Sequence, residues 1–209
     1  MRELLRYYKE KKKEIRDRLR DFRDNYKKGD EHVFSELCFC LLTPQADALK
    51  CDAAIKDLRE TGLLVNGSAG DIRPRIKAAR FWNNKSRYLV EARRLFKKNG
   101  CFRVKPLINE EDISGTRDWL VKNVKGMGYK EASHFLRNIG FGRDLAILDV
   151  HILKNLKRCG VIRKLPRSLT KKEYFNIENK LRKFSKKIKI PMDELDLLFW
   201  SRETGVVFK

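Results

Sequence analysis

Two residues that could take part in covalent chemistry lie 19 positions apart: Lys130, in Val-Lys-Gly-Met-Gly-Tyr-Lys (124–130), and Asp149, in Leu-Asp-Val-His-Ile (148–152). A neutral lysine amine is a nucleophile, and a carboxylate stabilises positive charge that develops in a transition state. An ordinary lysine has a pKa of about 10.4, so its amine must first lose a proton. The dipole of a helix that begins nearby favours that loss, whereas a neighbouring carboxylate opposes it. The sequence leaves this balance open.

Gly126 and Gly128 separate two segments with short helical patterns, 116–123 and 129–138. Alternate glycines permit positive φ and close backbone approach, so the unit is predicted to be a helix-hairpin-helix. Its turn directs backbone N–H groups towards the start of the second helix, where anions are favoured. A phosphodiester is the expected anion. By itself, Gly-x-Gly-x-Lys is typical of an exposed lysine that binds phosphate in a non-catalytic module.

The charge of the chain is strongly positive: 49 Lys and Arg oppose 28 Asp and Glu, which gives a net charge of +21 and a pI near 9.9. This balance suits a polyanionic partner such as nucleic acid. No segment is apolar over the roughly 20 residues of a membrane span, and the N-terminus lacks a signal-peptide core. The five cysteines have no metal-ligand spacing and are expected to be reduced thiols: Cys38, Cys40, Cys51, Cys101 and Cys159. Cys38 and Cys40 have apolar neighbours and are expected to be buried.

The spacing of apolar residues predicts an all-α chain without strands. A first amphipathic helix carries a stripe from Tyr8 to Tyr26, and a second runs from Val33 to Leu42 before Thr43-Pro44. Further helices are expected over 46–61, 70–80 and 85–98, over about 170–185 from the capping-box pair Thr170 and Glu173, and after Pro191.

Three further segments carry a family resemblance: Phe34–Gln45, Phe81–Tyr88 and Phe199–Lys209. Together with the hairpin and Asp149, they resemble the archaeal-type 8-oxoguanine DNA glycosylase/AP lyases, the second family of such enzymes in the helix-hairpin-helix superfamily of DNA glycosylases. The resemblance covers nearly the whole chain. It implies two helical subdomains with a DNA-binding cleft between them, formed by residues 30–140 and by residues 1–29 with 141–209. Lys130 and Asp149 would face each other across this cleft.

In this family the hairpin lysine and the later aspartate are the catalytic pair. Lys130 would attack C1′ of the damaged nucleotide, and the resulting Schiff base would allow β-elimination that cuts the strand. Asp149 would stabilise the cation at C1′, a role compatible with capping a helix. His151 would contact a DNA phosphate, although an isolated histidine is more often structural.

The resemblance also implies a pocket for the flipped base. Because 8-oxoguanine carries a hydrogen on N7, a backbone carbonyl near Pro44 and Gln45 could accept it. Trp200 would stack on the base, and His134 would line its opposite side. The C-terminal Lys209 would help to recognise the lesion. The alternatives are that Trp200 is a core residue and that the tail is frayed.

Asn83 and Asn84 resemble the turn that, in related glycosylases, fills the gap left by the flipped nucleotide and contacts the partner cytosine. Phosphate contacts are expected from basic side chains, although none can be told from solvated surface: Lys85, Arg87, Lys125, Arg137 and Arg143. No cofactor and no metal are expected, since nothing after Cys159 could supply an iron–sulfur loop. The expected partner is double-stranded DNA with 8-oxoguanine or abasic sites, bound by a monomeric, cytoplasmic, nucleoid-associated prokaryotic protein without membrane contact.

Two other functions fit part of the pattern. A glycosylase for another damaged or mismatched base would share the hairpin, although such relatives usually carry the iron–sulfur cysteines. A non-catalytic helix-hairpin-helix module would share the basic charge and the glycine turn, but it would not need Asp149.

Overall fold

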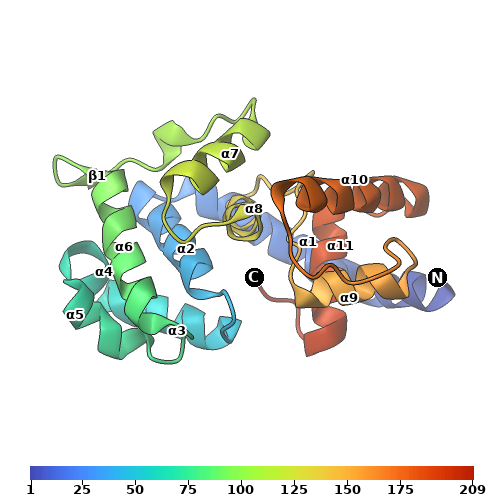
Figure 1. Cartoon of the computed structure of the whole chain (residues 1–209), viewed down its shortest axis with the longest axis horizontal. Helices are drawn as coiled ribbons and strands as arrows, with labels where there is room; N and C mark the ends of the chain where they lie inside the picture. The colour runs from blue at the N-terminus through green and yellow to red at the C-terminus, as the bar shows by residue number, and fades with distance from the viewer. The chain divides into compact units, whose positions relative to one another are not determined.

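The computed structural model describes all residues from 1 to 209. It contains eleven α-helices, two short 3-10 helices and one two-stranded hairpin, so the predicted all-α fold class is confirmed (Figure 1). The chain divides into two compact units, which we call unit 1 (residues 1–24 and 136–209) and unit 2 (residues 25–135). The divisions fall inside helices and lie five residues before the predicted boundaries.

Unit 2 is built around α2 (Asp30–Leu42), in which every residue from Val33 to Leu42 is buried. Its apolar side chains pack against α6 (Trp82–Phe96) and α3 (Ala48–Glu60), which lie beside it in Figure 1. The remaining elements of the unit are α4 (Leu63–Asn66), α5 (Ala69–Ile72), η1 (Arg73–Ile76), β1 (Lys97–Lys98), β2 (Cys101–Phe102), η2 (Lys105–Leu107), α7 (Ile113–Asn123) and the start of α8 (Tyr129–Asn138).

Two expectations for unit 2 were only partly right. The helix predicted over 70–80 is only the short α5 followed by η1, because Pro74 has no N–H to continue an α-helix. The helix predicted over 85–98 ends at Phe96, and Lys97–Lys98 pairs antiparallel with Cys101–Phe102. Asn99 and Gly100 have φ of 50° and 78°, the conformation that Asn-Gly adopts readily in a tight hairpin.

Unit 1 is held together by α11 (Met192–Thr204), whose residues from Leu195 to Phe199 are all buried. It packs against α9 (Val150–Arg158) and α10 (Lys171–Ile188). The first helix, α1 (Arg2–Lys27), buries the predicted stripe from Tyr8 to Phe22 and leaves Tyr26, its last member, half-buried. No helix of the chain combines the length and the apolar character that crossing a membrane requires.

Candidate functional site

The glycine turn between α7 and α8 depends on Gly126. Its φ is +84°, and a Cβ there would lie 2.4 Å from Cδ2 of Tyr88, so both backbone and space require glycine. Gly128 is different, since it does not adopt positive φ. Its N–H donates to Oε2 of Glu131 over 3.1 Å, which ties the turn to the first turn of α8. The tight hairpin therefore needs the left-handed conformation at one glycine only.

Lys130 is the second residue of α8, and its ammonium is already paired. Its Nζ lies 3.0 Å from Oε1 of Glu131, and the two side chains are 22% and 12% exposed. Glu131 thus holds the turn through Gly128 and the candidate nucleophile through Lys130. The sequence analysis missed Glu131. A glutamate three residues after the N-cap is a capping-box signal, but glycine in place of Ser or Thr at the N-cap concealed it.

Lys85 is not on the surface, so its prediction as a phosphate contact was wrong. The residue is 4% exposed, and its Nζ donates to the carbonyl oxygens of Leu42 (2.6 Å) and Pro44 (2.7 Å). Burial lowers the pKa of Lys85 to about 8, and the positive charge of Lys130 acts in the same direction. Lys85 and the candidate nucleophile are therefore electrostatic neighbours within unit 2.

The predicted base-reading turn follows α2 directly. Pro44 is half-buried, and Gln45 is exposed with φ of 54°. Left-handed backbone costs a non-glycine residue on the order of 1 kcal/mol, and such strain is concentrated at functional sites. His134 is 7% exposed and meets Phe39 edge-on, with ring centroids 5.6 Å apart. These contacts are those of a packed residue, and a role of His134 beside a base stays a prediction.

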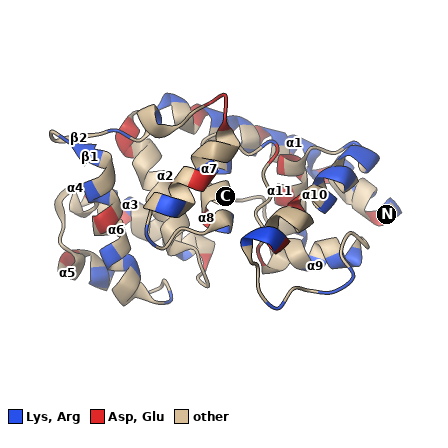
Figure 2. Ribbon diagram, turned by 45° about the horizontal axis from the view of Figure 1, so that its top comes forward, with Lys and Arg blue, Asp and Glu red and all other residues tan.

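The exposed asparagines lie where α6 begins. Asn83, Asn84 and Arg87 are all exposed, and Phe81 precedes them with φ of 61° and 53% exposure. The Arg80 guanidinium lies 4.8 Å from the centroid of the Phe81 ring. Lys and Arg are spread over helices of both units (Figure 2), so charge alone does not single out these residues. Their contacts with DNA stay predictions.

In unit 1, Asp149 caps α9. Its Oδ1 accepts the backbone N–H of Ile152 over 2.8 Å, and its ψ of −179° is typical of an N-cap. The capping role that the sequence allowed is therefore present. One oxygen of the carboxylate is held by the helix start, which fixes the direction of the side chain.

A second carboxylate, Asp196, lies inside unit 1. Burial raises the pKa of Asp196 to about 7, while Arg137 lowers it and Asp149 raises it. Arg137 approaches Asp196 to 3.4 Å, and its guanidinium lies 4.9 Å from the Phe22 ring centroid. Arg137 is 5% exposed, so its prediction as a phosphate contact was also wrong.

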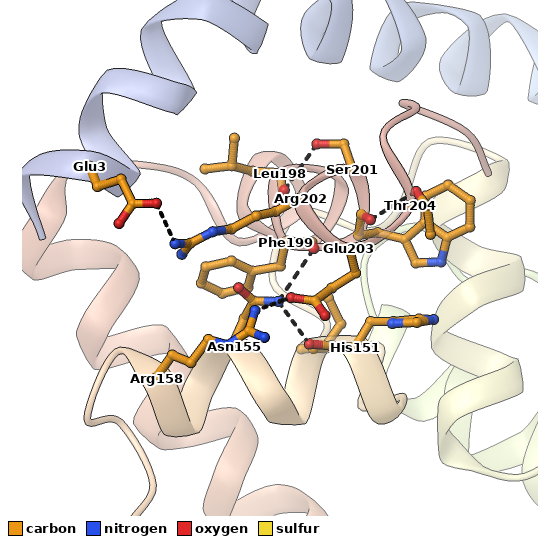
Figure 3. A network of polar contacts seen from close by, with 12 residues as sticks. Glu3, His151, Asn155, Arg158, Leu198, Phe199, Ser201, Arg202, Glu203 and Thr204 are labelled. Carbon is orange, nitrogen blue, oxygen red and sulfur yellow. Dashed lines mark hydrogen bonds and ion pairs between the residues drawn. The ribbon is translucent and has the colours of Figure 1, made fainter.

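A polar network joins α9 to α11 (Figure 3). The fully buried Asn155 points its amide at α11, where Nδ2 lies 3.0 Å from Oε1 of Glu203 and 3.4 Å from the Phe199 carbonyl. The same amide lies 3.0 Å from the carbonyl of His151, and Arg158 also pairs with Glu203. The helix that begins at Asp149 is thereby held against the helix that carries Trp200.

The C-terminal tail turns back after α11. Gly205 ends the helix with φ of 83°, and Val207 is 6% exposed. The rings of Trp200 and Phe208 have centroids 6.3 Å apart at an angle of 35°. Trp200 and Lys209 are both half-buried, so Trp200 is not a core residue and Lys209 is not fully exposed. This geometry keeps both near the end of α11.

Comparison with known proteins places the chain in a family. A family model described as 8-oxoguanine DNA glycosylase matches residues 15–190. The 8-oxoguanine DNA glycosylase/AP lyase of Fusobacterium nucleatum is 46% identical over 209 residues, covering 99% of this chain and 96% of the relative.

Two solved structures are similar over their whole lengths. One is the Methanocaldococcus jannaschii 8-oxoguanine glycosylase/lyase in complex with a 15mer DNA that contains 8-oxoguanine, with a TM-score of 0.87, 33% identity and complete coverage of both chains. The other is the 8-oxoguanine DNA glycosylase of Thermotoga maritima, with a TM-score of 0.85, 34% identity, and coverage of 100% of this chain and 97% of the other. The chain therefore belongs to the 8-oxoguanine DNA glycosylase family and has its helix-hairpin-helix fold.

Proposed function

We propose that this chain is a bifunctional DNA repair enzyme that excises 8-oxoguanine and then cleaves the strand at the abasic site. The observation that carries the proposal is the hairpin lysine in a chain of this family: Lys130 lies in the first turn of α8, after the Gly126 turn, and is paired with Glu131. The names of its relatives, 8-oxoguanine DNA glycosylase/AP lyase, support both activities.

In the proposed mechanism, the Lys130 ammonium first gives a proton to the Glu131 carboxylate, whose Oε1 lies 3.0 Å from Nζ. The amine attacks C1′, the C1′–N9 bond breaks, and its electron pair leaves with the base. Asp149 stabilises the positive charge that develops on the sugar. The product is an aminal between Lys130 and C1′, which opens to a Schiff base. The C2′ proton is then lost, and the C3′–O bond breaks with departure of the 3′ phosphate.

Base recognition is proposed for the turn at Pro44 and Gln45 and, separately, for His134, Trp200 and Lys209. The backbone strain at Gln45 and the inward tail beside Trp200 support this assignment. DNA contacts are proposed for the hairpin glycines and for exposed or half-exposed residues: Asn83, Asn84, Arg87, Gly126, Gly128 and His151. The setting proposed for the enzyme is the prokaryotic cytoplasm and nucleoid, where it acts as a monomer.

Borohydride trapping tests the proposal. The wild-type protein should form a covalent band with a duplex that contains 8-oxoguanine and none with the matching guanine duplex. Lys130→Gln should abolish the band while binding persists. Lys125→Gln is the matched control, because Lys125 lies in the same hairpin and is exposed beside Glu91. A band from Lys130→Gln would remove Lys130 from the role, and trapping only on another damaged base would reassign the substrate.

A further inference from the structure

Lys85 is a buried cation whose hydrogen bonds all go to one short segment. At 4% exposure, its ammonium needs acceptors to offset the loss of water. It finds them in the carbonyls of Leu42 and Pro44, at 2.6 Å and 2.7 Å. Leu42 is in the last turn of α2, where carbonyls have no partner within the helix. The Lys85 ammonium therefore supplies the hydrogen-bond donor that a further turn of α2 would have supplied to the Leu42 carbonyl.

The other two carbonyls of this segment, those of Thr43 and Gln45, differ in whether they have a donor. The Thr43 carbonyl accepts the N–H of Ala46 over 3.0 Å, and the Leu42 carbonyl also accepts the thiol of Cys51 over 3.4 Å. The Gln45 carbonyl has no donor from the protein. Lys85 thus holds the turn from both sides of Thr43 and leaves the strained Gln45 with its carbonyl open.

We propose that Lys85 is a positioning residue of the base site: its ammonium clamps the Leu42 and Pro44 carbonyls and so sets the shape of the turn that reads the lesion. The inference rests on the proposed function, because the turn is assigned to base recognition there. Lys85 touches neither the base nor the sugar in this assignment. It acts through the backbone that accepts the N7 hydrogen.

The contacts of Lys85 should matter more for base excision than for cleavage of an abasic site. Excision must distinguish 8-oxoguanine from guanine and depends on the position of one carbonyl, whereas cleavage of a preformed abasic site involves no base. Small displacements of positioning groups cost up to about a hundredfold in rate. Loss of the Lys85 ammonium should therefore slow excision far more than abasic-site cleavage.

The experiment compares single-turnover rates on an 8-oxoguanine duplex and on a preformed abasic duplex. Lys85→Met keeps the length of the side chain and removes its donors, so excision should fall by roughly tenfold to a hundredfold relative to abasic-site cleavage. Lys85→Arg keeps the cation and its donors and should restore much of the ratio. Arg94→Met, at an exposed position of the same helix, should leave the ratio unchanged.

Equal loss of both rates in a folded Lys85→Met protein would overturn the proposal, as would wild-type values of both rates. If the Met variant does not accumulate, Lys85→Gln, which keeps one short donor, gives the same comparison of rates. The proposed function is checked separately by the wild-type protein: failure of the wild type to excise 8-oxoguanine would overturn that function, whatever the Lys85 variants do.

Discussion

Unit 2 and unit 1 each bury a charged side chain near a candidate catalytic residue, but they stabilise it differently. In unit 2, Lys85 has two carbonyl acceptors within 2.7 Å. In unit 1, Asp196 has Arg137 at 3.4 Å, and its pKa rises to about 7. Two short hydrogen bonds fix the position of a group. A buried carboxyl without them accepts a proton easily. The first arrangement is suited to holding shape, and the second to responding to pH.

The candidate catalytic residues differ in the same way. Lys130 is bound by a side chain, since Glu131 pairs with its ammonium. Asp149 is bound by the backbone, since its carboxylate caps α9. The nucleophile can thus move once its ion pair breaks, whereas the aspartate stays where the helix start holds it.

The largest expected effect is at the fixed group. Asp149→Asn should slow excision by about a hundredfold or more, because the negative charge that we propose stabilises the C1′ cation is lost. Asparagine is as good an N-cap as aspartate, so thermal unfolding should change little. Single-turnover excision and a melting curve on the same sample separate the two roles. A well-folded Asn variant with wild-type excision would show that Asp149 is only a cap.

At the adjustable group, Glu131→Gln should slow borohydride trapping by on the order of tenfold to a hundredfold, because the proton acceptor beside Lys130 becomes neutral. The amide oxygen can still accept the N–H of Gly128, which preserves the turn. Glu91→Gln serves as the control, since the half-exposed Glu91 pairs with Lys125 over 3.4 Å. Unchanged trapping kinetics in Glu131→Gln would make Glu131 a turn residue alone.

The next prediction concerns the dependence of stability on pH. The folded-state pKa of Asp196, about 7, lies above its ordinary value of 3.8, so the folded protein keeps this proton to higher pH than the unfolded chain. The free energy of unfolding should therefore fall between about pH 4 and pH 7, by at most about 1.4 kcal/mol per pH unit. Asp196→Asn should lack this component of the fall, as measured by urea denaturation at pH 5 and pH 8.

Lys85 should show the opposite sign. Its folded-state pKa of about 8 lies below the ordinary 10.5, so the unfolded chain binds more protons between these values and stability rises with pH. Lys85→Met should lack that rise when urea denaturation is compared at about pH 8 and about pH 10. Identical pH profiles for wild type and both variants would mean that the two buried charges do not differ as described.

Features that depend on neighbours in the sequence could be predicted. The apolar stripe of α1, the hairpin around Gly126 and the N-caps at Asp149 and Thr170 follow from residues within a few positions, and the structure contains each of them. The Asn99-Gly100 turn carried an equally local signal that the helical pattern before it obscured. Helix periodicity and capping are short-range effects, so one sequence suffices to recognise them.

The surroundings of the charged residues required the tertiary structure. Lys85 stands in a motif that suggests an exposed cation, yet its acceptors come from Leu42 and Pro44, about 40 residues earlier. Arg137 turns inward because Asp196 on α11 is buried with it. Asn155 similarly joins α9 to Glu203 of α11. Local sequence determines which residues are polar. Whether a polar group meets water or a distant carbonyl depends on how the helices pack, because burial without a partner is too costly to persist.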